Sequence, residues 1–478
     1  MVVGEFAEKR DLVIIGGGPG GYNAAIRAAQ LGLGVTLIEK KQLGGVCLNE
    51  GCIPSKVFAH AAKKYATVPH LSSLGISTGE INFDYSRLLK YKDKTVNRLR
   101  KGVETLCAAN KIEIIHGKAN FTAENRVGVE SGHQFDTYEF NHAIIAAGSS
   151  PIKTDFLTDN SGRILSSEEI YNLKEMPKEL LVYGSDYIAL EIAFSYRSLG
   201  SDVSLILDGK DDFSFDHSIN RELKRMLKKQ NINIHRGFHL DTISTEKNEA
   251  KVHLFKDGKE KTITGSHAYL TTRQYAGAAS LGIDRFGIAT TESGFIETNR
   301  QMRTSIHNVF AVGDITAGNS IAVKAIKQGK IAAETIAGMN SEADLTFLPT
   351  IVHTNPPIAA VGLTEHEAID AGYSVKASSF SYTGNSYATV TNEKSGITKI
   401  IKDEETDLLL GFHTIGAGAI ELISTAVTSL EMVGRDEDLL FPLYPHPSFN
   451  ETILEAVEGL TEQAIHVAPV GEKKVRMK

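Results

Sequence analysis

Residues 11–25 read DLVIIGGGPGGYNAA, an apolar run followed by a glycine-rich turn and then by alanines. The apolar run predicts a buried parallel strand, and the alanine-rich stretch predicts a helix. Gly16 and Gly18 permit a tight turn and the close approach of a pyrophosphate, while Gly21 permits close packing of the helix on the strand. The helix N-terminus adds backbone amides and a positive dipole end. This stretch therefore predicts a dinucleotide site.

The residues after this helix strengthen that prediction. A second apolar strand is expected at residues 35–38, and it ends at Glu39, about twenty residues after the turn. An acid at this place can accept hydrogen bonds from ribose hydroxyls. A glycine fingerprint alone is a weak signal, but here strand, turn, helix, second strand and acid follow in the required order. We therefore expect a Rossmann-type domain at the N-terminus.

The same order of elements recurs further along the chain. A strand is expected at residues 179–183, a turn begins at Gly184, and a helix at 190–199 leads to a strand at 203–207 that ends at Asp208. This internal repeat predicts a second dinucleotide-type domain. Between the two units, residues 143–151 predict a buried strand that runs into a turn.

Two of the three cysteines lie close together, at Cys47 and Cys52, with glycines on both sides. If Cys52 opens the helix-like run at 53–62, the helix dipole lowers the pKa of its thiol and favours the thiolate. A reversible dithiol/disulfide pair is the leading interpretation, and two unlinked core cysteines are the alternative. The third cysteine, Cys107, lies in a helix-like stretch and is expected to be buried.

The second half of the chain contains two further candidate sites. A buried strand expected at 308–312 ends in Gly313-Asp314, where a carboxylate beside a helix start can hold a ribityl hydroxyl. After about residue 347, alternating strands and helices predict a separate α+β domain. Near its end, His446 and Glu451 straddle a turn and a helix start, so they could meet as a base and its orienting carboxylate. A surface turn histidine is the alternative.

Bulk composition narrows the class of protein. A length of 478 residues predicts roughly three domains. The net charge of -7 argues against a nucleic-acid or anionic-membrane partner. No apolar run approaches the ~18 residues of a membrane span, and residues 1–10 lack the apolar core of a signal peptide. We therefore expect a cytoplasmic location, where a disulfide is more often catalytic than structural.

Taken together, these motifs resemble the flavoprotein disulfide reductases over nearly the whole chain. The cysteine block ending in Ile53-Pro54-Ser55-Lys56 is more similar to the lipoamide branch than to the glutathione or trypanothione reductases. The resemblance implies an α/β fold with two Rossmann-like dinucleotide-binding domains and a C-terminal α+β dimerisation domain. The implied division is an FAD-binding domain with the redox dithiol at 1–150, an NAD-binding-type domain at 151–276, a central domain completing the FAD site at 277–346, and a dimer-interface domain at 347–478.

The resemblance also implies the reaction. Protein-bound dihydrolipoamide would be oxidised through Cys47 and Cys52, and electrons would pass through FAD to NAD+. Cys47 would exchange with the substrate and Cys52 would face the flavin, while His446 and Glu451 would come from the other subunit of a homodimer. The implied partner is a lipoyl-bearing carrier protein, and no metal site is expected. The implied FAD contacts are Gly16, Gly18, Gly21, Glu39, Lys56, Ala119, Gly148, Asp314 and Ala322, and the implied NAD contacts are Gly184, Glu191, Asp208 and Arg273, with Lys56 paired to Glu191.

The departures from the family pattern cluster on the nicotinamide side. Asp186 stands where a glycine normally admits the pyrophosphate, and Thr272 and Tyr275 alter the loop around Arg273. Like charges ~4 Å apart cost about 1 kcal/mol in water and about 4 kcal/mol near a protein surface. Three interpretations stay open: intact NAD binding with Asp186 turned toward a cation or solvent, a dithiol–flavin enzyme that uses NAD(H) poorly and serves another electron carrier, and a non-catalytic flavin-binding subunit. The retained cysteines argue against the last.

Overall fold

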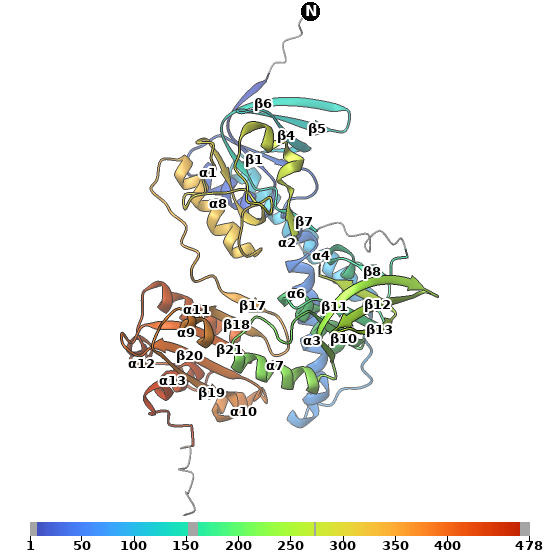
Figure 1. The fold of residues 1–478 in the computed structure, drawn as a ribbon, viewed down its shortest axis with the longest axis vertical. Helices are drawn as coiled ribbons and strands as arrows, with labels where there is room; N and C mark the ends of the chain where they lie inside the picture. The colour runs from blue at the N-terminus through green and yellow to red at the C-terminus, as the bar shows by residue number, and fades with distance from the viewer. Residues whose placement is uncertain (1–6, 152–160, 272–273, 469–478) are drawn as a thin grey trace, which may run out of the picture.

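The computed structural model describes residues 7–151, 161–271 and 274–468. These residues form three parts, seen in Figure 1 as a first sheet at the top, a second sheet on the right and a C-terminal sheet at the lower left. The predicted fold class, two Rossmann-like units followed by an α+β unit, is confirmed.

The first sheet is organised around β1 (Glu8–Ile15), which pairs in parallel with β2 (Val35–Glu39) and β6 (Gln134–Ile145). Leu12 and Ile14 pack on one side of the sheet and Val13 on the other, which explains the continuous apolar run. The strand order is β3-β2-β1-β6-β5-β4, with β16 beside β6. The other strands are β3 (Glu113–His116), β4 (Lys118–Ala123), β5 (Arg126–Ser131) and β16 (Val309–Ala311).

Two helices cover one face of this sheet. α1 (Pro19–Gln30) packs against α8 (Ala322–Ile336), although their sequences lie far apart. A Cβ at Gly329 would lie 2.3 Å from the Gly20 carbonyl oxygen, so the close contact of the two helices requires glycine there. The 3-10 turn η5 (Gly313–Ile315) leads from β16 toward α8.

The cysteine block lies between the first and second sheets (Figure 1). It consists of α2 (Gly45–Asn49) and α3 (Cys52–Thr67), and α3 packs against α4 (Tyr85–Ala109) and against α6 (Tyr187–Leu199) of the second unit. The ring of Phe58 on α3 is wholly buried and lies 5.1 Å from that of Tyr171. The 3-10 turn η1 (Val68–Leu74) follows α3. The helix that carries Cys52 is therefore anchored on both units.

The second sheet repeats the parallel pattern of the first. β9 (Glu179–Tyr183) lies between β10 (Asp202–Asp208) and β14 (His267–Leu270), parallel to both. The order is β13-β12-β11-β10-β9-β14-β8, and β7 (Ser149–Pro151) pairs with β15 (Gln274–Ala276) in the connection between the sheets. The other elements are β8 (Ile164–Leu165), α5 (Ser167–Ile170), α7 (His217–Lys229), β11 (Asn233–Glu246), β12 (Glu249–Lys256), β13 (Lys259–Gly265), η3 (Gly277–Leu281) and η4 (Ile283–Phe286).

One helix boundary differs from the prediction. We expected a helix over 190–199, but α6 begins at Tyr187 because the Asp186 side chain caps its first turn. A carboxylate at this position satisfies an amide of the first turn, and the helix therefore starts directly after the glycine turn.

The C-terminal sheet has the order β17-β18-β21-β20-β19 and is antiparallel. α11 packs on β18 and β21, and α13 packs on β19 and β20. The elements are β17 (Thr350–Val352), β18 (Ile358–Gly362), α9 (Glu365–Asp370), β19 (Val375–Ser381), η6 (Tyr382–Gly384), α10 (Ser386–Val390), β20 (Ile397–Asp403), β21 (Leu409–Ile415), α11 (Ala419–Glu431), α12 (Asp436–Leu440), α13 (Glu451–Glu458) and η7 (Gly459–Thr461).

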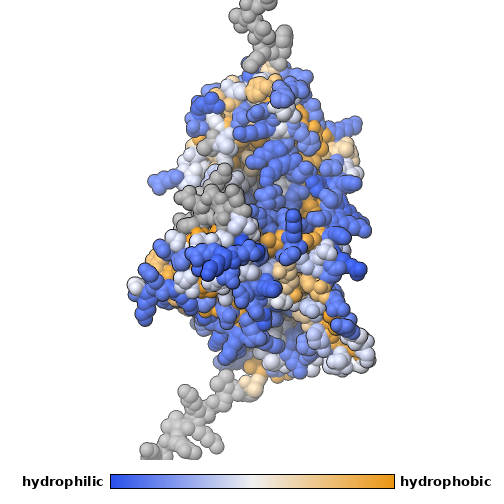
Figure 2. Space-filling view, turned by 90° about the vertical axis from the view of Figure 1, so that its right-hand side faces the viewer, coloured by the Kyte–Doolittle hydropathy of each residue, from blue (hydrophilic) through white to orange (hydrophobic). Residues whose placement is uncertain are grey.

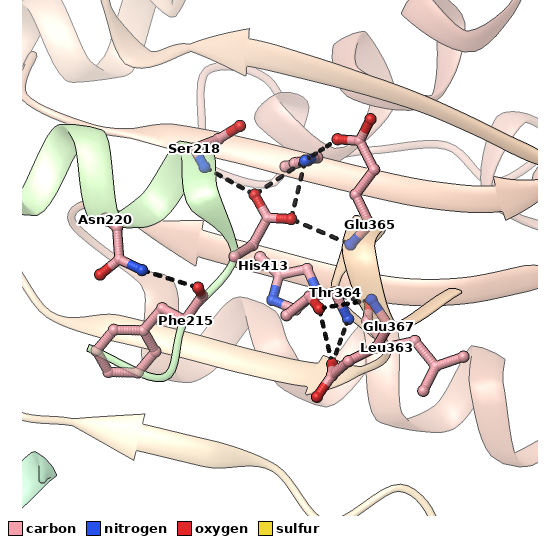
Figure 3. Close-up of polar contacts among 10 residues, drawn as sticks. Phe215, Ser218, Asn220, Leu363, Thr364, Glu365, Glu367 and His413 are labelled. Carbon is pink, nitrogen blue, oxygen red and sulfur yellow. Dashed lines mark hydrogen bonds and ion pairs between the residues drawn. The ribbon is translucent and has the colours of Figure 1, made fainter. Parts of the chain in front are cut away.

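A buried ionic network joins the second unit to the C-terminal sheet. Asp216 precedes α7, accepts from the Ser218 amide and binds Lys399 on β20 with both carboxylate oxygens at 2.9 Å. Lys399 also contacts Glu365, whose backbone amide donates to Asp216. Figure 3 labels Ser218 and Glu365, two of the residues in this network. The side chains of Lys399 and Asp216 are 2% and 1% exposed. Burial opposes ionisation of Asp216, but the hydrogen bonds from Lys399 and Ser218 outweigh it and lower the pKa of the carboxyl.

The surface of the described chain is mostly hydrophilic on the face drawn in Figure 2. Within residues 7–151, 161–271 and 274–468, no helix is both long and apolar enough to cross a bilayer. Several large apolar side chains are nevertheless exposed in the C-terminal unit, among them Phe441 at 91% and Leu443 at 100%. Apolar exposure of this kind is typical of a surface that a partner covers.

Candidate active site

Cys47 and Cys52 form a disulfide, with their Cα atoms 4.6 Å apart. Cys47 lies on α2, and Cys52 is the first residue of α3. Gly51 is the N-cap of α3, and among the described residues no side chain caps this helix start. The positive end of the helix dipole therefore acts on Cys52 without a neutralising side chain. This arrangement favours the thiolate when the disulfide is reduced.

The cysteine block packs closely against the first glycine turn, with Gly45 next to Gly18. Gly45 has φ +57°, and a Cβ built on it would lie 2.8 Å from the Cα of Gly18. Because only glycine avoids this clash, the sequence Gly44-Gly45 places the disulfide-bearing helices directly beside the turn. Cys107, in contrast, is fully buried in α4, and burial raises the pKa of its thiol.

The first glycine turn offers an anion site. A Cβ at Gly21 would lie 1.8 Å from the Gly16 carbonyl oxygen, so helix and turn meet as closely as the sequence predicts. Gly18 is the N-cap of α1, and in the described part of the chain no side chain caps α1 and its first turn holds no acid. The nearest described atom to a Cβ built on Gly18 is Gly45 Cα, 3.9 Å away. The free amides and open space fit the pyrophosphate of FAD.

Glu39 lies buried at the end of β2, next to this turn. Its Oε2 accepts from the Gly17 amide at 2.7 Å and its Oε1 accepts from the Lys41 amide at 2.6 Å. Each oxygen of a carboxylate has a further lone pair, so the fixed side chain can still accept from ribose hydroxyls. This geometry also fits FAD.

The remaining expected FAD contacts lie on the same unit. Asp314 is in η5, where burial raises the pKa of its carboxyl and Lys324 acts in the opposite direction. Ala322 is the first residue of α8. Gly148 follows β6 with φ +73°, and Ala119 is buried in β4 opposite Val129. Their contacts with FAD remain predictions.

Lys56 and Glu191 are paired, as the resemblance implied. The Lys56 ammonium donates to both carboxylate oxygens of Glu191 at 2.9 Å, which links α3 to α6. Glu191 Oε1 also accepts from the backbone amide of His353, whose imidazole has a pKa lowered by burial and by Lys56. Lys56 is four residues after Cys52, one helical turn along α3. The sequence did not reveal the contribution of His353, because it lies 162 residues from Glu191.

His446 and Glu451 meet at the start of α13. His446 Nδ1 lies 2.7 Å from Glu451 Oε1, and Glu451 Oε2 accepts from the Ser448 amide at 2.9 Å. The His446 side chain is 72% exposed, so its other ring nitrogen can be reached from outside the subunit. Figure 1 places α13, which begins at Glu451, far from α2, which carries Cys47, in the same chain. A single chain therefore does not bring this pair to Cys47 and Cys52.

The second glycine turn differs from the first. A Cβ at Gly184 would lie 2.4 Å from Thr271 Oγ1, so this glycine is required. Asp186 is the N-cap of α6, and its Oδ1 accepts from the Ala189 amide at 2.8 Å and from the Thr271 hydroxyl at 3.5 Å. The Asp186 carboxylate therefore caps its own helix through Oδ1, and the residue is partly exposed to solvent.

The acid at the end of β10 is also engaged. The Tyr183 hydroxyl donates to Asp208 Oδ1, and His239 Nδ1 lies 3.9 Å from the same oxygen. The sequence analysis missed Tyr183 and Thr271, although both stand at strand ends beside the turn. Thr272 and Arg273 lie outside the described residues. In this second site Asp208, an expected NAD contact, and Asp186, the residue at the pyrophosphate position, both have intramolecular partners.

Comparison with known proteins agrees with this arrangement. Residues 10–329 match the family model described as pyridine nucleotide-disulphide oxidoreductase, and residues 348–457 match that of its dimerisation domain. The chain is 37% identical over 470 residues to a dihydrolipoyl dehydrogenase of Bacillus subtilis (strain 168), covering 98% of this chain and 100% of the relative. A dihydrolipoyl dehydrogenase of Geobacillus stearothermophilus is also 37% identical over 470 residues, with 98% and 99% covered.

Solved structures share the fold. LpdA from Mycobacterium tuberculosis superposes with a TM-score of 0.88 at 23% identity, covering 94% of this chain and 99% of that structure. The family model spans the first and second units, and the dimerisation model spans the C-terminal unit. The disulfide lies at the start of α3, the helix that packs against α6 of the second unit. The chain therefore belongs to the pyridine nucleotide-disulphide oxidoreductase family.

Proposed function

We propose that this chain oxidises the dihydrolipoyl group of a carrier protein to the cyclic disulfide, with Cys47 and Cys52 as the immediate acceptor, FAD as the electron carrier and NAD+ as the final acceptor. The observation that carries the proposal is the Cys47–Cys52 disulfide at an uncapped helix start, pressed against an open glycine turn. Relatives named dihydrolipoyl dehydrogenase that match along 98% of the chain support the choice of substrate.

The cysteine chemistry is thiol–disulfide exchange. A substrate thiolate attacks Cys47 Sγ, forms a mixed disulfide and releases Cys52 as a thiolate, which the α3 dipole stabilises. The second substrate thiolate then attacks the substrate sulfur of the mixed disulfide, which closes the substrate disulfide and releases Cys47. Two electrons thereby pass from the substrate to the cysteine pair, and the two substrate protons pass to bases. Bound FAD supplies the acceptor for these two electrons.

His446 is the proposed base. Glu451 holds Nδ1 and thereby fixes the tautomer, so the second nitrogen can accept a substrate proton, and the carboxylate stabilises the imidazolium that forms. Since the pair is remote from the disulfide of its own chain, it would face the disulfide of the other subunit. The match to a dimerisation domain and the exposed Phe441 and Leu443 support a homodimer of this kind.

Lys56 acts as a positioning residue in this proposal. Its ion pair with the buried carboxylate of Glu191 fixes one turn of α3, and that turn directly follows the turn carrying Cys52. The dithiol helix is therefore held in one orientation relative to both units, which is the precision that a thiol exchange between three sulfurs requires.

The test is anaerobic reduction of the FAD-loaded protein by dihydrolipoamide, followed by absorbance. We expect flavin reduction in the parent with a long-wavelength band, and a rate at least about a thousandfold lower in Cys47→Ser and Cys52→Ser, as for removal of a nucleophile. Cys107→Ala is the matched control, because this thiol is buried in α4 and not in the pair. Reduction that survives in Cys47→Ser and Cys52→Ser contradicts the proposal.

A further inference from the structure

Asp186 occupies the position in the second unit that Gly18 occupies in the first. Both residues are the N-cap of the helix that follows a glycine turn, α6 in one case and α1 in the other. In a dinucleotide fold, this helix start binds the pyrophosphate through its free amides and its dipole. The two units therefore present the same architecture with different groups at the point where phosphate binds.

The Asp186 carboxylate satisfies the helix start from within the chain. Its Oδ1 accepts from the Ala189 amide at 2.8 Å, and the Thr271 hydroxyl approaches the same oxygen from the end of β14. A negative group at the positive end of the helix dipole is favourable for the protein alone. The carboxylate also occupies an amide of the first turn that a phosphate would otherwise bind. It places a negative charge at the helix start, where the phosphate charge would lie.

The acid at the end of β10 also has an intramolecular partner. Asp208 stands where an acid would bind the adenosine ribose, and one of its oxygens accepts from the Tyr183 hydroxyl. The same hydroxyl accepts from the Leu240 amide at 3.2 Å, which fixes Tyr183 between two elements of the sheet. The first unit instead holds its acid, Glu39, with backbone amides alone. The two acids are therefore held by different groups, a phenol for Asp208 and backbone amides for Glu39, and each keeps lone pairs for a ribose hydroxyl.

We propose that Asp186 is an internal competitor for the pyrophosphate site of the second unit and keeps the affinity of this protein for NAD(H) low. The inference rests on the proposed function for the identity of the nucleotide, and it adds the residue that sets its affinity. When the nucleotide binds, the carboxylate must leave the Ala189 amide or remain beside the pyrophosphate as a like charge. At ~4 Å, the like charge alone lowers affinity about fivefold in water and about a thousandfold near a protein surface.

The test is calorimetric titration of the oxidised, FAD-loaded protein with NAD+ and, separately, with ADP-ribose. Asp186→Gly is expected to bind both ligands at least about fivefold more tightly than the parent. Glycine is itself an accepted N-cap, so α6 is retained, and equal thermal melting of parent and variant checks this. Asp186→Asn keeps a cap without the charge and is expected to share the gain.

Two controls separate this effect from others. Asp211→Gly removes an exposed carboxylate from the same unit and is expected to leave both affinities unchanged, so that a change in total charge does not account for the gain. ADP-ribose lacks the nicotinamide, so a gain shared by both ligands places the effect at the pyrophosphate, whereas a gain for NAD+ alone overturns the proposal. Equal affinities in the parent and in Asp186→Gly also overturn it.

A separate measurement distinguishes failure of the proposed function from failure of the role proposed for Asp186. Reduction of the flavin by dihydrolipoamide in the parent protein needs no pyridine nucleotide, so its absence rejects the proposed function without bearing on Asp186. Conversely, normal reduction by dihydrolipoamide together with unchanged nucleotide affinity in Asp186→Gly rejects the role of Asp186 alone.

Discussion

The two glycine turns of this protein share a fold and differ in charge. In the first, Gly18 leaves the start of α1 uncapped within the described chain, and Gly21 must be glycine because a Cβ would lie 1.8 Å from the Gly16 carbonyl oxygen. In the second, Asp186 caps α6, and the helix position that matches Gly21 is Ala189. One βαβ scaffold can thus hold an open anion site or a self-satisfied one. Fold alone does not decide what such a turn binds.

The largest effect is expected when the first glycine turn is given an aspartate at Gly18, the position that matches Asp186 in the second turn. Gly18→Asp is expected to lower FAD affinity by about a hundredfold or more, because a carboxylate would face a pyrophosphate with two charges. Gly18 has φ -69°, and the space at its Cβ is open, so the new side chain introduces charge rather than strain. The measurement is the fraction of flavin retained on dialysis, with Gly18→Asn as the neutral control. Equal retention in Gly18→Asp and Gly18→Asn would show that charge at this turn is irrelevant.

A second, smaller effect concerns pH. Burial raises the pKa of the Asp186 carboxyl, and the hydrogen bonds from Ala189 and Thr271 offset this only in part. The carboxyl therefore becomes neutral at a higher pH than an ordinary aspartate, and the internal competitor loses its charge as the pH falls through this raised pKa. The neighbouring Tyr187 and Tyr269 phenols, whose pKa values burial raises, stay neutral in this range.

We accordingly expect NAD+ affinity in the parent to rise about tenfold as the pH falls toward that pKa, a change equivalent to about 1.4 kcal/mol. Titrations at several pH values would measure it. Asp186→Asn should remove this dependence, and a dependence of equal size in that variant would assign it to another group.

The smallest expected effect concerns Asp208, the acid of the second unit that matches Glu39 in the first. Tyr183→Phe removes the hydroxyl that donates to Asp208 Oδ1, so one more lone pair of this carboxylate is open to a ribose hydroxyl, and we expect NAD+ affinity to rise about fivefold. The Leu240 amide loses its acceptor, which should lower the free energy of unfolding by about 1 kcal/mol. Calorimetry and denaturant unfolding measure the two effects. An affinity that falls would indicate that Tyr183 orients Asp208 for the nucleotide.

The chain order made much of this site predictable. Strand, glycine turn, helix and acid follow one another locally, so β1, α1 and Glu39 could be placed from sequence, as could the Cys47–Cys52 pair at the start of a helix. The direction of the Asp186 side chain could not be predicted, since a turn carboxylate can face a ligand, solvent or its own helix. Aspartate is a preferred N-cap, and that preference was the available signal.

Contacts between distant segments were the other unpredictable part. Thr271 reaches Asp186 across 85 residues, and Lys399 reaches Asp216 across 183. No local pattern announces such pairs, because their partners are set by how whole units pack. The Lys56–Glu191 pair, separated by 135 residues, was expected only because the resemblance supplied it.

The buried pair of Asp216 and Lys399 has a consequence for motion. Both charges are almost inaccessible to water, so counter-ions cannot take the place of either partner, and parting them would leave two unsolvated charges. The second unit and the C-terminal sheet are therefore expected to turn as one rigid body. A rotation of the second unit relative to the first is therefore expected to carry the C-terminal sheet with it.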